Sequence, residues 1–207
     1  MYIPPPNRLE DRAEILAAIA QARLATLVTS TEQGLQATPL PLYLEPDEGP
    51  FGTIYGHLAR ANPHWTLAPT GEALAIFPGP HAYVTPAWYA AKAETGKVVP
   101  TWNYQAIHAH GPIEFFEDPA RLLAIVTRLT NLHEAGRPTP WAVSDAPADF
   151  VQTMLRGIIG LRLPITRLEA KRKMSQNRPA TDRAAVAAAL AASPRPSDRE
   201  AAALIPT

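Results

Sequence analysis

The sequence predicts a mixed α+β fold, mainly β, in which antiparallel strands curl into a barrel and helices flank it. Three observations lead to this class. Apolar residues recur at helical spacing near the start, short runs of β-type composition follow between turn signals, and helix signatures return in the second half. A chain of 207 residues with 46% apolar composition can bury the core that such a domain needs.

An opening helix is expected over about residues 8–22. Asn7 stands three residues before Glu10, which is the spacing of a capping box. The apolar residues that share one helical face are Leu9, Ile15, Leu16 and Ile19.

Four runs typical of β-strands follow this helix: RLATLVTS, LQATPLPLYLE, GTIYGHLA and EALAIFPG. The turn signals EQG and PDEG lie between them, and a further strand is expected over about residues 99–116. Strands joined by such short connections predict an antiparallel meander, which we expect to close into a barrel.

The second half begins with a helix signature at Asp118-Pro119, which predicts a helix to about Glu134. A shorter helix is expected over Pro147 to Leu155. The run GIIGLRLPITRLEAKRKM alternates after Gly160, which predicts one last long strand. Its exposed positions are expected to be Arg162, Arg167 and either Lys171 or Arg172.

The domain organisation follows from a change in composition near residue 180. We expect a single domain over residues 1–180. Residues 181–207 are rich in alanine and contain SPRPSDRE, which predicts one short helix followed by a loosely held tail.

The charge balance excludes a strongly basic or acidic protein. Lysine and arginine total 19, as do aspartate and glutamate, so direct DNA binding and membrane-surface binding receive little support. Cysteine is absent, which excludes disulfides and thiolate metal sites. The start of the chain lacks a basic region followed by an apolar run, and the expected location is the cytoplasm.

The stretch GHLARANPHW follows a predicted strand and combines a cation with a new helical turn. His57 and Arg60 are three residues apart, and Asn62-Pro63 suits the start of a helix. Free N–H groups and a guanidinium that converge in this way can bind a phosphate. The alternative interpretation is an ordinary strand-to-helix corner with a surface arginine.

Aromatic residues gather in two further stretches, FPGPHAYVTPAWY and VVPTWNYQ. The first can simply be an aromatic rim that packs the mouth of a barrel. After the second, His108 and His110 have strand spacing and should face the same side. Two histidines make an incomplete metal site, so no metal is expected and hydrogen-bonding roles are favoured.

The stretch KRKMSQNR places basic residues directly before Ser175, Gln176 and Asn177. Such a run is usually a solvated strand end. The supply of amide donors and cations beside one turn also suits a phosphorylated or multiply polar ligand.

Taken together, MYIP at the start, GHLARANPHW, FPGPHAYVTPAWY, VPTWNYQAIHAHG and KMSQNR resemble the PaiB-type proteins, described as FMN-binding negative transcriptional regulators. The resemblance extends to about residue 190. It implies an FMN-binding split barrel, a six-stranded Greek-key-like barrel similar to pyridoxamine-phosphate-oxidase-like proteins. It also implies a homodimer with flavin at the subunit interface.

The resemblance further implies which residues hold FMN. One wall would present its backbone to the ring, the GHLARAN stretch would contact the phosphate and ribityl chain, and the VVPTWNYQ stretch would form the other wall. A flavin ring needs flat apolar surface and a few hydrogen bonds at its edge. The residues implied are Thr38, Pro39, Leu40, His57, Arg60, Asn62, Thr101, Trp102, Asn103, Tyr104, Lys173, Ser175 and Gln176.

Three functions remain open at this point. The first is a flavin-binding transcriptional regulator or sensor without turnover, although no recognition helix can be identified. The second is a flavin-dependent oxidoreductase, for which His57, His81 and His108 could supply an acid or base. The third is a barrel that has lost flavin and binds haem through a histidine.

Overall fold

The computed structural model describes residues 1–90, 92 and 95–206. The chain forms two compact units. Unit 1 comprises residues Met1–Ala18, Pro78–Ile107 and Glu169–Thr207, and unit 2 comprises Ile19–Phe77 and His108–Leu168. Strands β5 (Ala73–Val84) and β6 (Thr101–Gly111) continue from one unit into the other.

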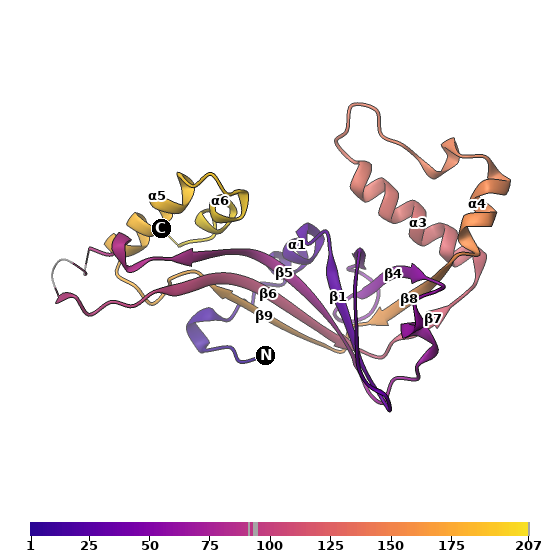
Figure 1. Cartoon of the computed structure of the whole chain (residues 1–207), viewed down its shortest axis with the longest axis horizontal. Coiled ribbons are helices and arrows are strands. Elements are labelled where there is room, and N and C mark those ends of the chain that lie inside the picture. Colours follow the sequence, from indigo (N-terminus) through magenta and orange to yellow (C-terminus); the bar gives the residue numbers. More distant parts are fainter. Residues whose placement is uncertain (91, 93–94, 207) are drawn as a thin grey trace. The chain divides into compact units, whose positions relative to one another are not determined.

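Unit 2 contains a four-stranded antiparallel sheet of order β3-β4-β8-β7. Its strands are β3 (Leu42–Glu45), β4 (Thr53–Ala59), β7 (Glu114–Phe116) and β8 (Ile158–Pro164). Helices α3 (Pro119–Glu134) and α4 (Ala148–Leu155) lie beside β7 and β8 (Figure 1). The buried residues of this layer are Tyr43, Phe116, Leu122, Ile125, Leu129 and Leu155.

A hairpin of β1 (Ala25–Thr31) and β2 (Gly34–Leu40) also belongs to unit 2. Its register runs from Ala25 opposite Leu40 to Thr31 opposite Gly34. Gly34, which directly follows the turn residues Glu32 and Gln33, has a φ of 102°, a conformation that side chains disfavour. In the five-stranded sheet of order β2-β1-β5-β6-β9, β2 is an edge strand, with β9 (Arg167–Lys173) at the opposite edge.

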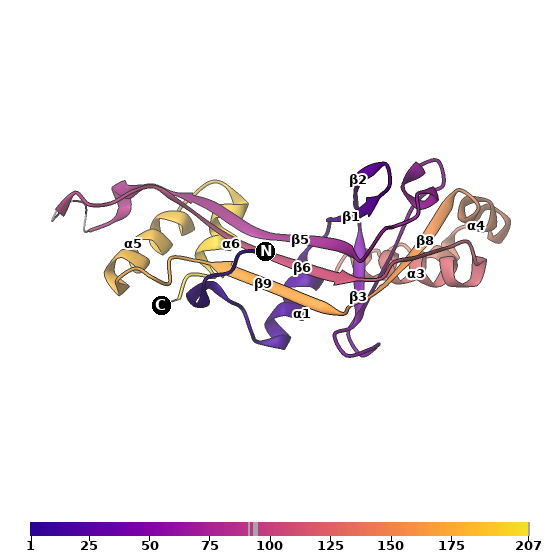
Figure 2. The same cartoon turned by 90° about the horizontal axis from the view of Figure 1, so that it is seen from below.

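Unit 1 packs α5 (Ala180–Ala191) and α6 (Pro196–Ala202) against neighbouring strands β5, β6 and β9 (Figures 1 and 2). The buried residues of this core are Ala82, Val84, Tyr89, Met174, Val186, Leu190, Ala201, Ala202 and Ile205. Alternate residues of each strand face opposite sides of a sheet, so Ala82 and Val84 face the helices while His81 and Tyr83 do not. The remaining described helix is α1 (Arg12–Gln21), and the 3₁₀ turns are η1 (Pro5–Asn7), η2 (Pro63–Thr66), η3 (Pro86–Trp88) and η4 (Val143–Asp145).

The α+β antiparallel fold class is confirmed, as are two of the helices. Asp118 caps α3, where its carboxylate accepts a hydrogen bond of 2.8 Å from the Arg121 backbone N–H. Helix α4 begins directly after Pro147 and ends at Leu155. The helices of the described ranges include none that is long and apolar enough to cross a membrane.

The predicted start of the first helix is wrong. Asn7 ends the turn η1, and Arg8 forms a bridge to Lys171 in extended conformation. The helix begins four residues later, at Arg12, and the Asp11 carboxylate accepts a 3.0 Å hydrogen bond from the Glu14 N–H. Pairing of the preceding segment with β9 therefore prevents the helix from starting at residue 8.

Three expected strands are each divided in two. Pro41 separates the run LQATPLPLYLE into β2 and β3, and the segment 99–116 divides into β6 and β7. The run after Gly160 is not one strand: β8 ends at Pro164 and β9 begins at Arg167, in the other sheet. A proline cannot donate to a ladder, so each break coincides with a missing N–H.

The structure also decides two expectations about exposure. Of the alternatives Lys171 and Arg172, Lys171 is only 6% exposed, because its Nζ donates to the Tyr2 carbonyl at 3.1 Å and lies over the rings of Tyr2 and Tyr104, whereas Arg172 is half-buried. The C-terminal tail is packed rather than loose: Ala201 and Ile205 are buried in the unit 1 core.

Candidate functional site

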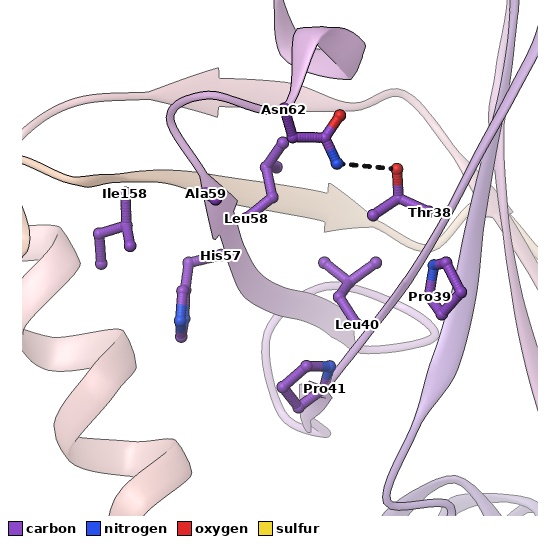
Figure 3. Close-up of a pocket in the computed structure, with 9 residues that line it drawn as sticks. All are labelled: Thr38, Pro39, Leu40, Pro41, His57, Leu58, Ala59, Asn62 and Ile158. Carbon is purple, nitrogen blue, oxygen red and sulfur yellow. Dashed lines mark hydrogen bonds between the residues drawn. The ribbon is translucent and has the colours of Figure 1, made fainter.

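A pocket of about 390 Å³ lies in unit 2, where β2 meets the start of β3 and the end of β4 (Figure 3). Its lining is mostly apolar with three polar side chains, which is typical of small-molecule sites. The lining residues are Thr38, Pro39, Leu40, Pro41, His57, Leu58, Ala59, Asn62 and Ile158. The family resemblance implied five of these as flavin contacts: Thr38, Pro39, Leu40, His57 and Asn62.

The polar end of the pocket is organised by the short turn η2. The Asn62 side chain caps this turn by accepting a 3.0 Å hydrogen bond from the His64 backbone N–H. Because the Asn62 oxygen is used in this way, its amide nitrogen is turned toward Thr38 and donates to the hydroxyl at 3.2 Å (Figure 3).

A buried hydrogen-bonded chain extends behind this contact. His64 is 2% exposed and lies between two threonines: its Nδ1 is 2.8 Å from Thr38 Oγ1 and its Nε2 is 2.8 Å from Thr29 Oγ1. Burial lowers the pKa of His64, so the ring is neutral near pH 7. The order Thr29, His64, Thr38, Asn62 therefore links strand β1 to the pocket wall.

His57 supplies the third polar side chain. In Figure 3 it lies toward Ile158, away from the Thr38–Asn62 pair. Its buried Nδ1 has no hydrogen-bond partner within the described part of the chain, and burial lowers the pKa of the imidazole. A neutral ring with an unsatisfied nitrogen is suited to bind a polar atom of a ligand.

Arg60, which the sequence singled out for phosphate binding, does not line this pocket. Its guanidinium forms a 2.9 Å ion pair with Glu117 and donates to the Arg156 carbonyl at 2.6 Å. It also lies 6.0 Å from the centre of the Trp65 ring. Phosphate binding by Arg60 stays a prediction. It requires the guanidinium to exchange its bonds to Glu117 and the Arg156 carbonyl for bonds to the phosphate.

A second group of predicted residues lies in unit 1. The ring of Trp102 stacks on His81 with a centroid distance of 5.8 Å and is 6.0 Å from Tyr83. Trp102 and Tyr83 are each 48% exposed. We call these three residues, His81, Tyr83 and Trp102, the ring cluster.

A lysine lies beside the ring cluster at the end of β9. The Lys173 Nζ donates to the Trp102 carbonyl at 2.8 Å and to the Thr101 hydroxyl. Burial, together with the nearby positive charges of Lys171 and Arg178, lowers the pKa of Lys173, while Tyr104 acts in the opposite direction. A bound anion would favour the charged form of this ammonium group.

Three of the remaining predicted residues of unit 1 hold the turn that follows β9, whereas the centre of the Tyr104 ring lies 5.0 Å from the Lys171 Nζ. Asn103 is fully buried and exchanges hydrogen bonds of 3.0 and 3.2 Å with Ser175. Ser175 has a φ of 62°, a left-handed conformation that a tight turn imposes. Gln176 accepts from the Met174 N–H at 2.6 Å and donates to the Arg172 carbonyl.

Sequence reasoning missed His64 and Thr29. The signal for His64 was present in Asn-Pro-His, where an Asx cap directs the following backbone N–H groups. Thr29 could not be identified, because its partner is 35 residues away and only the fold brings them together. His108 and His110 lie as predicted, with ring centroids 6.4 Å apart.

Known proteins resemble this chain in sequence. Residues 1–167 match the family model described as "Putative FMN-binding domain". The chain is 34% identical to the Bacillus subtilis protein named Protease synthase and sporulation protein PAI 2, over 88% of this chain and 85% of that protein. It is 36% identical to an uncharacterized protein of Aspergillus fumigatus, over 73% of this chain and 74% of that protein.

Two solved structures share the fold at low sequence identity. The FAD and haem binding protein of Mycobacterium smegmatis superposes with a TM-score of 0.61 at 14% identity, over 86% of this chain and 79% of that chain. A flavocytochrome of Azotobacter vinelandii superposes with a TM-score of 0.55 at 15% identity, over 78% and 67%.

Proposed function

The chain belongs to the PaiB-type family of FMN-binding domains with FMN as cofactor, and from this premise we propose a flavin-dependent regulator or sensor that works as a homodimer. One observation carries the proposal. Tyr83 and Trp102 of the ring cluster are each 48% exposed, and the Lys173 ammonium donates to the Trp102 backbone carbonyl. Exposed flat rings next to a cation suit a ligand that has both an aromatic ring system and a phosphate.

The residues fit FMN by the chemistry of their donors. Trp102 and Tyr83 offer ring surface, and Lys173 offers a charged donor. The pocket of unit 2 is a separate set of polar groups: Thr38 and Asn62 offer hydrogen bonds there, and the buried His57 Nδ1 lacks a partner within the described residues. Bound FMN supplies electron-transfer chemistry, whereas the chain binds and orients it and excludes water.

A second candidate is a flavin-dependent oxidoreductase. It is favoured by His57, whose neutral imidazole could hold or accept a proton at Nδ1 within the pocket. Steady consumption of a nicotinamide cofactor by the FMN-loaded protein, abolished in His57→Gln, would favour this function over a sensor without turnover.

The homodimer predicts a measurable mass. Rings that are half exposed on one chain can be covered by a second copy, and a specific interface buries more than about 1,000 Å². Light scattering at micromolar concentration should give twice the chain mass of 22.4 kDa. A mass of 22.4 kDa would contradict the dimer but would not contradict FMN binding by the single chain.

The position of Lys173 predicts a selective effect on phosphate recognition. Lys173→Ala should weaken FMN by about 2 kcal/mol, because a charge-assisted hydrogen bond is lost, and should leave riboflavin nearly unaffected. Calorimetric titration with both ligands measures the difference. Arg60→Ala is the matched comparison: selective loss of FMN in that variant would assign the phosphate to Arg60, and equal loss of both ligands would assign it to neither residue.

The proposal that regulation acts through flavin is tested by DNA titration. The basic residues of β8 and β9 are largely engaged within the chain, since Arg162 pairs with Glu48, Arg172 with Glu14, and Lys171 is buried. We therefore expect random duplex DNA to bind no tighter than roughly 10⁻⁴ to 10⁻⁶ M, with shallow salt dependence. A sub-micromolar constant that falls steeply between two salt concentrations would instead support direct contact with DNA.

A further inference from the structure

The pocket of unit 2 lacks a formal charge on any of its lining side chains. All nine lining residues belong to the described part of the chain, and they include no lysine, arginine, aspartate or glutamate. The one titratable group, His57, is neutral near pH 7 because burial lowers its pKa. An uncharged pocket with apolar walls is a poor site for a phosphate, whose charge would lose its hydration without a compensating cation.

The polar end of the pocket instead carries adjacent hydrogen-bond donors. The Asn62 amide nitrogen has two hydrogens, of which the Thr38 hydroxyl accepts one. Thr38 has one hydroxyl hydrogen of its own. The group that accepts this hydrogen depends on the tautomer of His64, because a neutral imidazole carries a hydrogen on only one ring nitrogen.

Two hydrogen-bond patterns of Thr29, His64 and Thr38 fit the observed distances between their side chains. If His64 carries its hydrogen on Nε2, Thr38 must donate to Nδ1 and offers the pocket only a lone pair. If the hydrogen is on Nδ1, Thr29 donates to Nε2, His64 donates to Thr38, and the Thr38 hydrogen is released toward the pocket. In the second arrangement Thr38 accepts from both Asn62 and His64, and its O–H becomes a donor beside the second Asn62 hydrogen.

We propose that this pocket binds an uncharged carbonyl group, and that His64 is the positioning residue that makes Thr38 a donor to its oxygen. The carbonyl has two sources that share this chemistry. One is the carbonyl edge of a flavin ring, and the other is a separate small carboxamide. The proposal concerns unit 2 alone and does not depend on where the ring cluster binds flavin.

The experiment uses the full ¹⁵N-labelled chain and follows the backbone amides of Leu40, Leu58 and Ala59 by NMR. The probes are lumiflavin, which has the ring but no ribityl phosphate, and benzamide, with benzoate and benzylamine as charged compounds of the same size. We expect both neutral probes, or one of them, to shift these amides, and the charged compounds to bind at least about tenfold more weakly.

The two sources are separated by competition. Shifts with lumiflavin but not benzamide assign the pocket to the flavin ring. Shifts with benzamide that persist in saturating FMN assign it to a separate carboxamide ligand. Absence of shifts with both neutral probes, or tighter binding of benzoate, overturns the proposal. A chain that binds FMN but fails this test leaves the proposed function standing.

Variants test the role of His64. Thr38→Val removes the hydroxyl with little change of shape and should weaken the neutral probe about tenfold or more, whereas Thr38→Ser should restore binding. Thr29→Val lies outside the pocket lining yet removes the donor to His64 Nε2, so it should weaken the probe several-fold. Thr26→Val is the matched control on the same strand and should have no effect.

The imidazole nitrogens give an independent readout. Binding of the neutral probe should move the ¹⁵N resonances of His64 toward the form with hydrogen on Nδ1. An unchanged tautomer, or equal affinity in Thr29→Val and Thr26→Val, would show that His64 only supports the fold.

Discussion

Gly111→Ala is expected to lower the free energy of unfolding by about 3 kcal/mol or more. Gly111 ends β6, where the chain passes close to β8. A methyl group at this position would lie 2.0 Å from the Pro164 carbonyl oxygen and 3.1 Å from the Leu163 side chain. The nearest atom belongs to the backbone, so the clash cannot be relieved by rotating a side chain, and the strand itself must move.

Urea denaturation followed by far-ultraviolet circular dichroism measures this effect. Gly71→Ala is the matched control, because a methyl group there meets no atom within 4 Å. The control should change the unfolding free energy by less than about 0.5 kcal/mol. Equal stability of the two variants would mean that β6 and β8 do not approach each other as described.

Trp102→Ala is expected to weaken FMN binding by about 2 kcal/mol, roughly thirtyfold, while leaving the unfolding free energy nearly unchanged. The reason is the position of the ring. It is 48% exposed and contacts His81 and Tyr83 rather than the unit 1 core. Its removal should therefore lower the affinity for FMN much more than the free energy of unfolding.

Trp141→Ala provides the comparison for this prediction. Trp141 has nearly the same exposure, 49%, but lies in unit 2 outside every predicted site. Fluorescence titration with FMN should give wild-type affinity for this variant. Unchanged affinity in Trp102→Ala, or equal losses in both variants, would remove the ring cluster from the flavin site.

Local sequence signals predicted the elements whose causes are local. Asp118-Pro119 marked the start of α3, because a cap and its N–H groups are neighbours in sequence. Alternation after Gly160 predicted one long strand where the chain forms β8 and β9, and it could not show that these two strands join different sheets. The start at Asn7 failed for a similar reason, since a pairing with Lys171 far along the chain determined that segment.

The candidate site likewise contains residues that the sequence identified and side-chain partners that it could not identify. The stretches that suggested ligand chemistry contain the pocket residues His57 and Asn62 and the ring cluster residue Trp102, whereas Thr38 was implied only by the family resemblance. Sequence could not show that Asn103 is turned inward to Ser175 or that Arg60 is paired with Glu117. These partners are distant in sequence, and a side chain's choice between ligand and protein is decided by the folded surroundings.

Titration of the purified, flavin-free protein with FMN, followed by flavin fluorescence and absorbance, measures whether the chain binds the flavin. We expect saturable binding of one FMN per chain, with quenched fluorescence and a shifted absorption band, because the ring leaves water and stacks on aromatic side chains. A flavin spectrum that stays identical to free FMN at saturating protein concentration would contradict it.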